Sequence, residues 1–267
     1  MTQTPGAPSL SLIAELWYAD VPDLDDPAVL AALRAVSPAT EAQGGSLTVP
    51  HPLEDPDLPP LLTVVVPGSP LGQDGKALPD VSQTWDWAGA EATVARCRSS
   101  VLVTEMLAEG RGATERVTAL GQVVGALVGA TQPLALHWAR SQRVSDPAGF
   151  GPGDLDGVIN VRMFSEGQGD ALVMDTLGLH VFDLPDVQCH FRDRPPGEIA
   201  ELLFATAVYL FDTGDVIEDG NTISGTDGEG RYTCYREASL LDPARLVLDV
   251  DLGDPYAAGG RERSAPI

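Results

Sequence analysis

The segment 183–211 constrains the fold more than any other part of the chain. Its first nine residues are DLPDVQCHF, and polar and apolar side chains alternate along 187–191, which predicts a strand. A helix is predicted over 196–211, because Pro196 fits a first helical turn and apolar residues then recur at helical spacing. Gly214 lies beyond the expected end and is a typical stop signal. Such an amphipathic helix must bury its apolar stripe, and the neighbouring strand provides a sheet for it.

Short strand-like and helical segments alternate through the rest of the chain. A further helix is expected over 27–36, and further strands over 10–18, 61–66, 101–103, 134–138, 158–164, 171–176, 177–182, 232–235 and 245–250. Short connections with mixed elements favour an α+β protein. We expect two α/β subdomains, each a mostly antiparallel sheet with helices packed on one face, and this similarity also raises the hypothesis of a degenerate duplication.

The best candidate for a domain boundary is a segment rich in Gly, Pro and Asp. It reads SDPAGFGPGDLDG and leads into a strand-like run. The predicted organisation is therefore an N-terminal subdomain over 1–144, a linker over 145–156 and a C-terminal subdomain over 157–267.

One helix of the first half, around 117–130, is apolar enough to raise the question of a membrane span. It contains about fourteen apolar or small residues, fewer than the roughly 18–20 that a span needs, so we predict a buried helix with Thr114 as its N-cap. Glycines recur in it every four residues, at Gly121, Gly125 and Gly129. In a chain without a membrane segment this spacing indicates close packing of the helix on a sheet.

Charge limits the partners that the chain can bind. The 267 residues carry a formal net charge of −23, with acidic residues spread along the chain. Such a charge disfavours binding to nucleic acid or to an anionic membrane surface. Residues 1–75 hold ten acidic residues against the single basic residue Arg34, and this acidic face favours a basic protein partner. The charge is also compatible with a role in solubility alone.

Cysteine usage and the N-terminus indicate the compartment. Three cysteines without a CxxC spacing argue against a disulfide framework and against a zinc ribbon. The opening residues MTQTPGAPSL have neither a basic region nor an apolar run, so we expect no signal peptide. The sequence therefore predicts a cytoplasmic protein, and it indicates no cofactor and no metal.

The predicted strand at 187–191 carries the candidate chemistry. Its apolar residues face the core, whereas Asp186, Gln188 and His190 share the opposite face. His190 lies about 13 Å from Asp186 along an extended strand, so Asp193 or Glu198 near the helix start is the nearer carboxylate. An imidazole oriented by a carboxylate is a general acid/base unit. An ordinary hydrogen-bonded histidine on a polar strand face fits the same pattern.

Other residues are candidates for a ligand or interaction role. They are Gln188, Tyr209, Asp219, Thr222 and Arg245. His180 is interpreted as a lone histidine on another strand, and Arg245 is expected to form surface pairs with Asp242 and Asp249. No nucleotide, serine-hydrolase or zinc-protease motif completes the set.

Four blocks of the second half resemble a known bacterial family. They are LGLHVFDLPDVQCHF, AVYLFDTG, VIEDGNTISG and REASLLDPARLVLDV. Together they resemble the DUF4261 family over about residues 170–252. The family is a domain of unknown function, so the resemblance implies a soluble bacterial α+β protein and assigns no catalytic residue.

Three functional hypotheses follow. The leading one is a non-catalytic interaction protein, an adaptor or neutralising module with an acidic surface, because the charge is high and no catalytic set is complete. The alternative is a hydrolase that uses His190 with Asp186, Asp193 or Glu198, with or without a metal. The third is a structural role through a homodimer, formed by sheet edges or by the helix with spaced glycines.

Overall fold

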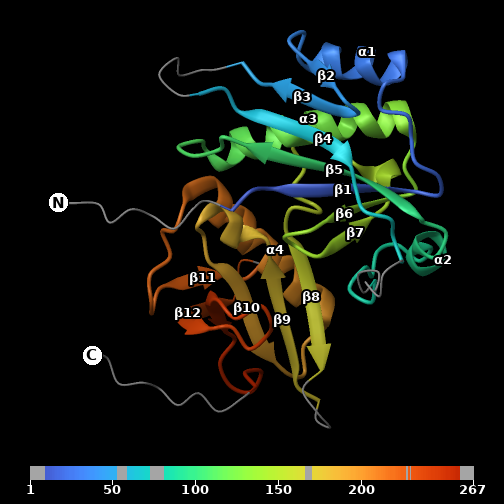
Figure 1. The fold of residues 1–267 in the computed structure, drawn as a ribbon. Helices are drawn as coiled ribbons and strands as arrows, with labels where there is room; N and C mark the ends of the chain where they lie inside the picture. The colour runs from blue at the N-terminus through green and yellow to red at the C-terminus, as the bar shows by residue number, and fades with distance from the viewer. Residues whose placement is uncertain are drawn as a thin grey trace. The chain divides into compact units, whose positions relative to one another are not determined.

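The structure is a computed structural model, and it describes residues 10–52, 59–72, 81–165, 170–226, 228 and 230–258. The chain divides between Asn160 and Val161 into two compact units (Figure 1). This division lies a few residues beyond the segment 145–156. The first nine residues, which carry most of the expectation about a signal peptide, lie outside the described part.

The first unit is built on a seven-stranded sheet with the order β2-β3-β4-β5-β1-β6-β7 (Figure 1). All the strand pairs recorded for this sheet are antiparallel. The strands are β1 (Ile13–Tyr18), β2 (Glu41–Gln43), β3 (Ser46–Pro50), β4 (Leu62–Pro67), β5 (Ser99–Met106), β6 (Ala135–Trp138) and β7 (Arg143–Ser145). β1 lies between β5 and β6, so the first described strand is an interior strand of the sheet.

Two helices of this unit pack together beside the sheet. They are α1 (Pro27–Val36), which contacts β3, and α3 (Ala113–Thr131), which contacts α1, β4 and β5 (Figure 1). With α1 and α3, the strands β1, β4, β5 and β6 follow a β-α-β-β-α-β sequence. Two shorter helices, α2 (Ala90–Val94) and the 3-10 helix η1 (Pro147–Gly149), lie in connections.

Local sequence explains where these helices begin. The Asp26 side chain accepts a hydrogen bond from the backbone N–H of Ala28, and Pro27 occupies the first turn of α1. The expected N-cap of α3 is wrong, because Gly112 caps that helix and Thr114 lies inside its first turn. No helix in the described part of the chain is both long enough and apolar enough to span a bilayer.

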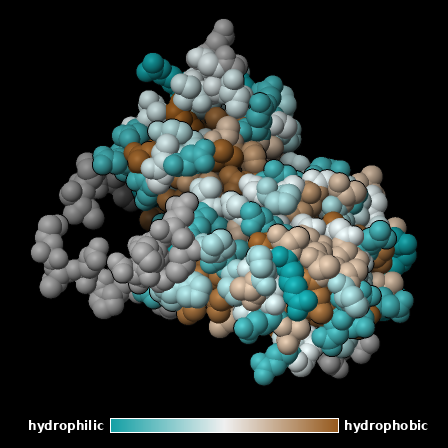
Figure 2. Space-filling model, turned by 90° about the horizontal axis from the view of Figure 1, so that it is seen from above, coloured by the Kyte–Doolittle hydropathy of each residue, from teal (hydrophilic) through white to brown (hydrophobic). Residues whose placement is uncertain are grey.

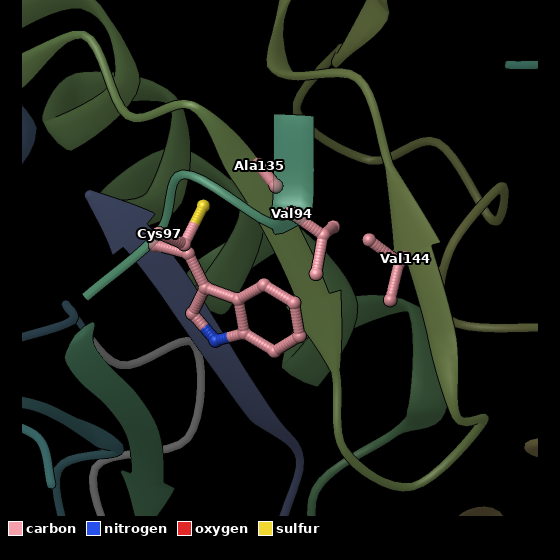
Figure 3. Close-up of a cluster of buried hydrophobic side chains, with 5 residues drawn as sticks. Val94, Cys97, Ala135 and Val144 are labelled. Atoms are coloured by element: carbon pink, nitrogen blue, oxygen red, sulfur yellow. The ribbon is translucent and has the colours of Figure 1, made fainter. Parts of the chain in front are cut away.

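Trp17 is at the centre of a buried cluster in this unit. Its side chain is fully buried and packs with Val94, Cys97, Ala135 and Val144, which come from α2, the turn after it, β6 and β7 (Figure 3). The cluster thus connects β1 with α2, β6 and β7, which all come much later in the sequence. All three cysteines are free and buried, so none of them forms a disulfide.

Two glycines of α3 pack against a loop, whereas the sequence predicted packing against a sheet. A Cβ atom built on Gly121 would lie 3.0 Å from the backbone nitrogen of Gly153, and one on Gly125 would lie 3.0 Å from a ring carbon of Pro152. These two glycines therefore admit the 152–153 loop, not a sheet. Gly129 has no neighbouring atom within 4 Å of such a Cβ.

This contrast predicts opposite effects of the same substitution. Gly129→Ala is expected to raise the free energy of unfolding by about 0.5–1 kcal/mol, because alanine is the better helix former and space is open. Gly121→Ala is expected to lose that gain and to destabilise by about 1 kcal/mol, because the backbone at Gly153 must shift. Urea unfolding followed by circular dichroism measures both. Equal stabilisation by the two substitutions would contradict the packing described.

The second unit is built on a six-stranded sheet with the order β11-β12-β13-β10-β9-β8 (Figure 1). The strands are β8 (Asn160–Ser165), β9 (Leu172–Leu177), β10 (Asp186–Phe191), β11 (Thr222–Ser224), β12 (Arg231–Ala238) and β13 (Leu246–Asp251). β10 pairs antiparallel with β9 and parallel with β13, whereas β12 pairs antiparallel with both β11 and β13. The helix α4 (Pro196–Thr213) contacts β9 and β10 with its apolar stripe buried.

The predicted fold class is confirmed, with two mostly antiparallel sheets and helices packed against them. One predicted strand is wrong. Residues 177–182 do not continue as a strand, because Gly178 takes φ 142° and the chain turns into the 3-10 helix η2 (Leu179–Phe182). That turn brings His180 to the end of the sheet, where β10 begins.

The surface mixes polar and apolar residues. Hydrophilic and hydrophobic residues lie side by side over the face drawn in Figure 2. Large apolar side chains with exposure of 40% or more are Leu10, Val21, Trp85, Met106, Leu107, Tyr209, Val216, Leu240 and Leu246. Single exposed apolar residues are normal, so their surroundings decide whether any of them marks an interface.

Candidate functional site

A row of polar side chains crosses the middle of the second sheet. Gln188 on β10 lies directly opposite Asp175 on β9 and opposite Asp249 on β13. Residues directly opposite one another in a sheet share a face, so these three side chains lie on one face. The Gln188 side-chain amide donates to the Asp249 carboxylate at 3.1 Å. The row is buried, since Asp175 and Gln188 have no exposed surface and Asp249 is 2% exposed.

Asp186 extends this row toward the start of β10. Its carboxylate accepts hydrogen bonds from the backbone N–H of Leu179 at 3.0 Å and from Nε of Arg245 at 2.9 Å. Its second oxygen also lies 3.2 Å from Nδ1 of His180. The carboxylate is fully buried. Asp186 is therefore held by η2 on one side and by the residue that precedes β13 on the other.

Two arginines neutralise the two innermost carboxylates. Arg162 on β8 binds Asp175 through two parallel hydrogen bonds, at 2.9 and 2.6 Å. Arg245 donates to Asp175 at 2.6 Å as well as to Asp186, so it bridges both carboxylates. At Asp175 and Asp186 two positive and two negative side chains balance in charge, which is the condition under which buried ions are tolerated. Asp249 is a third buried acid of the row, and it accepts from the Gln188 amide instead.

The 239–245 loop covers the polar row. Its Leu240 N–H donates to the Gln188 side chain at 2.8 Å, and the carbonyl oxygen of Asp242 accepts from Arg162 at 2.9 Å. Arg245 ends the loop and donates to the carbonyl oxygen of Pro243 at 2.9 Å. The face that carries Asp186 and Gln188 is thus closed by chain, and its polar groups hold that loop in place.

The structure brings together part of the predicted set. Asp186, Gln188 and Arg245 belong to one buried network. The expected surface pairs of Arg245 with Asp242 and Asp249 are wrong, because its guanidinium reaches Asp175 and Asp186 instead. Distance along the chain hid these partners, since Asp175 lies 70 residues before Arg245.

The other predicted residues lie elsewhere in the unit. Asp219 is exposed and accepts from the backbone N–H of Arg236 at 2.8 Å, and Thr222 is exposed on β11 opposite Thr233. Tyr209 is exposed on α4, 51%. Arg236 also forms an ion pair with Asp215 in the same acidic turn. Among the described residues no group of three or more His, Cys, Asp or Glu side chains is placed to hold a metal ion.

His190 and its predicted carboxylates are spread around the start of α4. His190 sits opposite Val173 with its ring Nε2 shielded from solvent. Asp193 is exposed, with φ 54° in the turn before the helix. Glu198 is exposed in the first turn of α4, where it pairs with Arg194 at 2.7 Å. Their roles as a catalytic set stay a prediction.

Four members of the network were not predicted from the sequence. Arg162, Asp175 and His180 were not assigned to it, and Asp249 was expected at the surface. For Asp175 a weak signal existed, because a lone acid inside an apolar strand such as LVMDTL indicates a buried charge that needs a partner. For His180 the signal was lost with the wrong strand at 177–182. Its side chain lies next to Asp186 because η2 turns back toward β10.

Comparison with protein families points to the same part of the chain. Residues 175–251 match the family model of DUF4261, a domain of unknown function. The resemblance seen in the sequence over about 170–252 is confirmed. The DUF4261 match begins at Asp175 and includes His180, Asp186, Gln188, Arg245 and Asp249, so all of the network except Arg162 lies inside it. No curated protein and no solved structure matches the chain.

Proposed function

We propose that this protein is an interaction module that binds a basic protein through the exposed side of α4. The observation that carries the proposal is the composition of that side. The exposed residues at helical spacing along it are Glu198, Glu201, Ala205, Tyr209 and Asp212. This stripe, called the α4 surface below, has three acids and an exposed tyrosine.

The charge and the exposed tyrosine of the α4 surface both favour binding of a basic protein. The net charge of −23 attracts a cationic partner over a distance and raises the rate of encounter. Tyrosine is enriched among the residues that dominate interface energies, and a small Ala205 beside it leaves room for a partner side chain. Asp186 and Arg245 support the proposal indirectly, since their hydrogen bonds are used to hold the 239–245 loop.

The test compares two matched variants in affinity capture from cells of the native organism. The first variant, Glu201→Gln/Tyr209→Ala, removes an acid and the aromatic residue from the α4 surface. The control, Glu91→Gln/Trp85→Ala, removes an exposed acid and an exposed aromatic residue from the first unit. We expect the wild type and the control to retain the same basic protein and the α4 variant to retain at least about tenfold less.

Two further readouts locate the contact. A photo-crosslinking residue at Ala205 should join the retained protein, and the yield should fall as salt is raised, because screening weakens contacts between exposed charges. The proposal fails if no basic protein is retained, or if the α4 variant retains it as well as the control does.

A further inference from the structure

His180 combines a partly exposed ring with a hydrogen bond to a buried carboxylate. His51 and His137 are buried, and Nε2 of His190 is shielded from solvent. The His180 side chain is 25% exposed while its Nδ1 lies 3.2 Å from the fully buried carboxylate of Asp186. An imidazole anchored on one side and open on the other is the arrangement that proton transfer requires.

The partner of Nδ1 determines which nitrogen carries the proton. The Asp186 carboxylate forms an ion pair with Arg245, and a carboxylate only accepts hydrogen bonds. Nδ1 of His180 must therefore be the donor. In the neutral ring Nε2 then carries the lone pair. No described residue forms a hydrogen bond with Nε2 of His180, so this lone pair is available to a ligand.

Asp186 is well suited to hold the ring. The backbone N–H of Leu179, next to His180 in η2, donates to the other oxygen of the same carboxylate at 3.0 Å. Arg245 fixes the carboxylate from the opposite side. The ring orientation is thus determined by buried groups before any ligand arrives, which lowers the cost of forming the reactive geometry.

We propose that His180 is a general base that takes a proton from water or from the hydroxyl group of a ligand, with Asp186 as its positioning residue. In ester hydrolysis, Nε2 accepts a proton from water as the water oxygen bonds to the carbonyl carbon. The bond from that carbon to the alcohol oxygen then breaks, and the alcohol leaves with the proton returned by Nε2. This activity is separate from the binding of a basic protein at the α4 surface.

The activity test uses ethyl dichloroacetate, an activated ester of an alkyl alcohol. Because ethoxide leaves poorly, an imidazole acts on such an ester as a general base and not as a nucleophile. The wild type is expected to release dichloroacetic acid faster than buffer does, and His180→Gln is expected to lower the protein-dependent rate at least about tenfold. The matched control is His137→Gln in the first unit, where Nδ1 also lies near a carboxylate, that of Glu15 at 3.4 Å, and this variant should keep the wild-type rate. Circular dichroism confirms that both variants are folded. No hydrolysis above buffer, or the same rate in His180→Gln as in the wild type, overturns the proposal.

A second readout does not depend on any substrate. Nitrogen NMR of the wild type at neutral pH is expected to show the His180 proton on Nδ1 and none on Nε2. Asp186→Ala removes the acceptor of Nδ1, so the preference for this tautomer should be lost. A wild-type ring protonated on Nε2 would contradict the proposal even if the Asp186 variant failed to fold. Both readouts are independent of partner capture, so either proposal can fail alone.

Discussion

Replacing Arg245 with methionine is expected to lower the free energy of unfolding of the second unit by about 3–5 kcal/mol. Arg245 donates to Asp186 at 2.9 Å and to Asp175 at 2.6 Å, and neither carboxylate has any exposed surface. Methionine keeps much of the length of the side chain but donates no hydrogen bond. Asp175 would then keep only Arg162, and Asp186 would be left as a buried carboxylate without an arginine.

The loop is expected to respond as well as the sheet. Arg245 also donates to the carbonyl oxygens of Thr176 and Pro243, both at 2.9 Å, so its loss frees the end of the 239–245 loop. Hydrogen exchange should therefore accelerate in this loop and at the start of β13 before it does in α4.

Chemical denaturation with Arg231→Met as the control measures the effect. Arg231 is an exposed arginine on β12, so its substitution should change stability by no more than about 0.5 kcal/mol. If Arg245→Met were as stable as the control, Asp175 and Asp186 could not both be buried ions, and the network described above would be wrong.

Alternation along β10 was sufficient to separate its two faces. It placed Asp186 and Gln188 opposite the apolar residues, and the structure agrees. Alternation gives no information about what lies over a face, because that depends on segments far away in the sequence. Here Leu240, 52 residues after Gln188, covers it and converts a face that looked open to solvent into a buried one.

Helices were predicted more closely than their contacts. The helix expected over 27–36 matches α1, and the one expected over 196–211 is two residues shorter than α4. Capping residues, proline and apolar periodicity are local signals, so they predict the bounds of a helix without knowledge of the fold. The strands β2, β3, β7 and β11 were not predicted. β2, β7 and β11 have only three residues each, too few to show a period that distinguishes a strand from a loop.

The neighbours of the α3 glycines were also outside the reach of the sequence. A repeat of small residues predicts close approach of another segment but does not identify it. The loop at Pro152 follows the helix by some twenty residues and happens to return to it. Gly129 belongs to the same repeat and meets nothing, so periodicity alone overstated its role.

The first unit contains its own buried ion pair, and removing one partner should destabilise that unit by about 3–5 kcal/mol. Glu105 on β5 is 2% exposed and Arg116 in the first turn of α3 is 4% exposed. Nε of Arg116 donates to the Glu105 carboxylate at 3.0 Å, and its Nη2 donates to the carbonyl oxygen of Leu10 at 2.6 Å. Arg116→Met leaves a buried carboxylate without its cation, whereas Arg96→Met, at an exposed arginine, is the control.

The double variant Glu105→Leu/Arg116→Met distinguishes loss of an attraction from the cost of an unpaired charge. Replacing both ions with apolar side chains removes the unpaired charge, so most of the lost stability should return. A deficit of about 1–3 kcal/mol should remain, because the Leu12 N–H loses the carboxylate that accepts it at 2.8 Å. Urea unfolding of the two single variants and the double variant gives the coupling energy. A double variant no more stable than Arg116→Met would mean that the pair acts by fixing the segment before β1, through Leu10 and Leu12, and not by charge compensation.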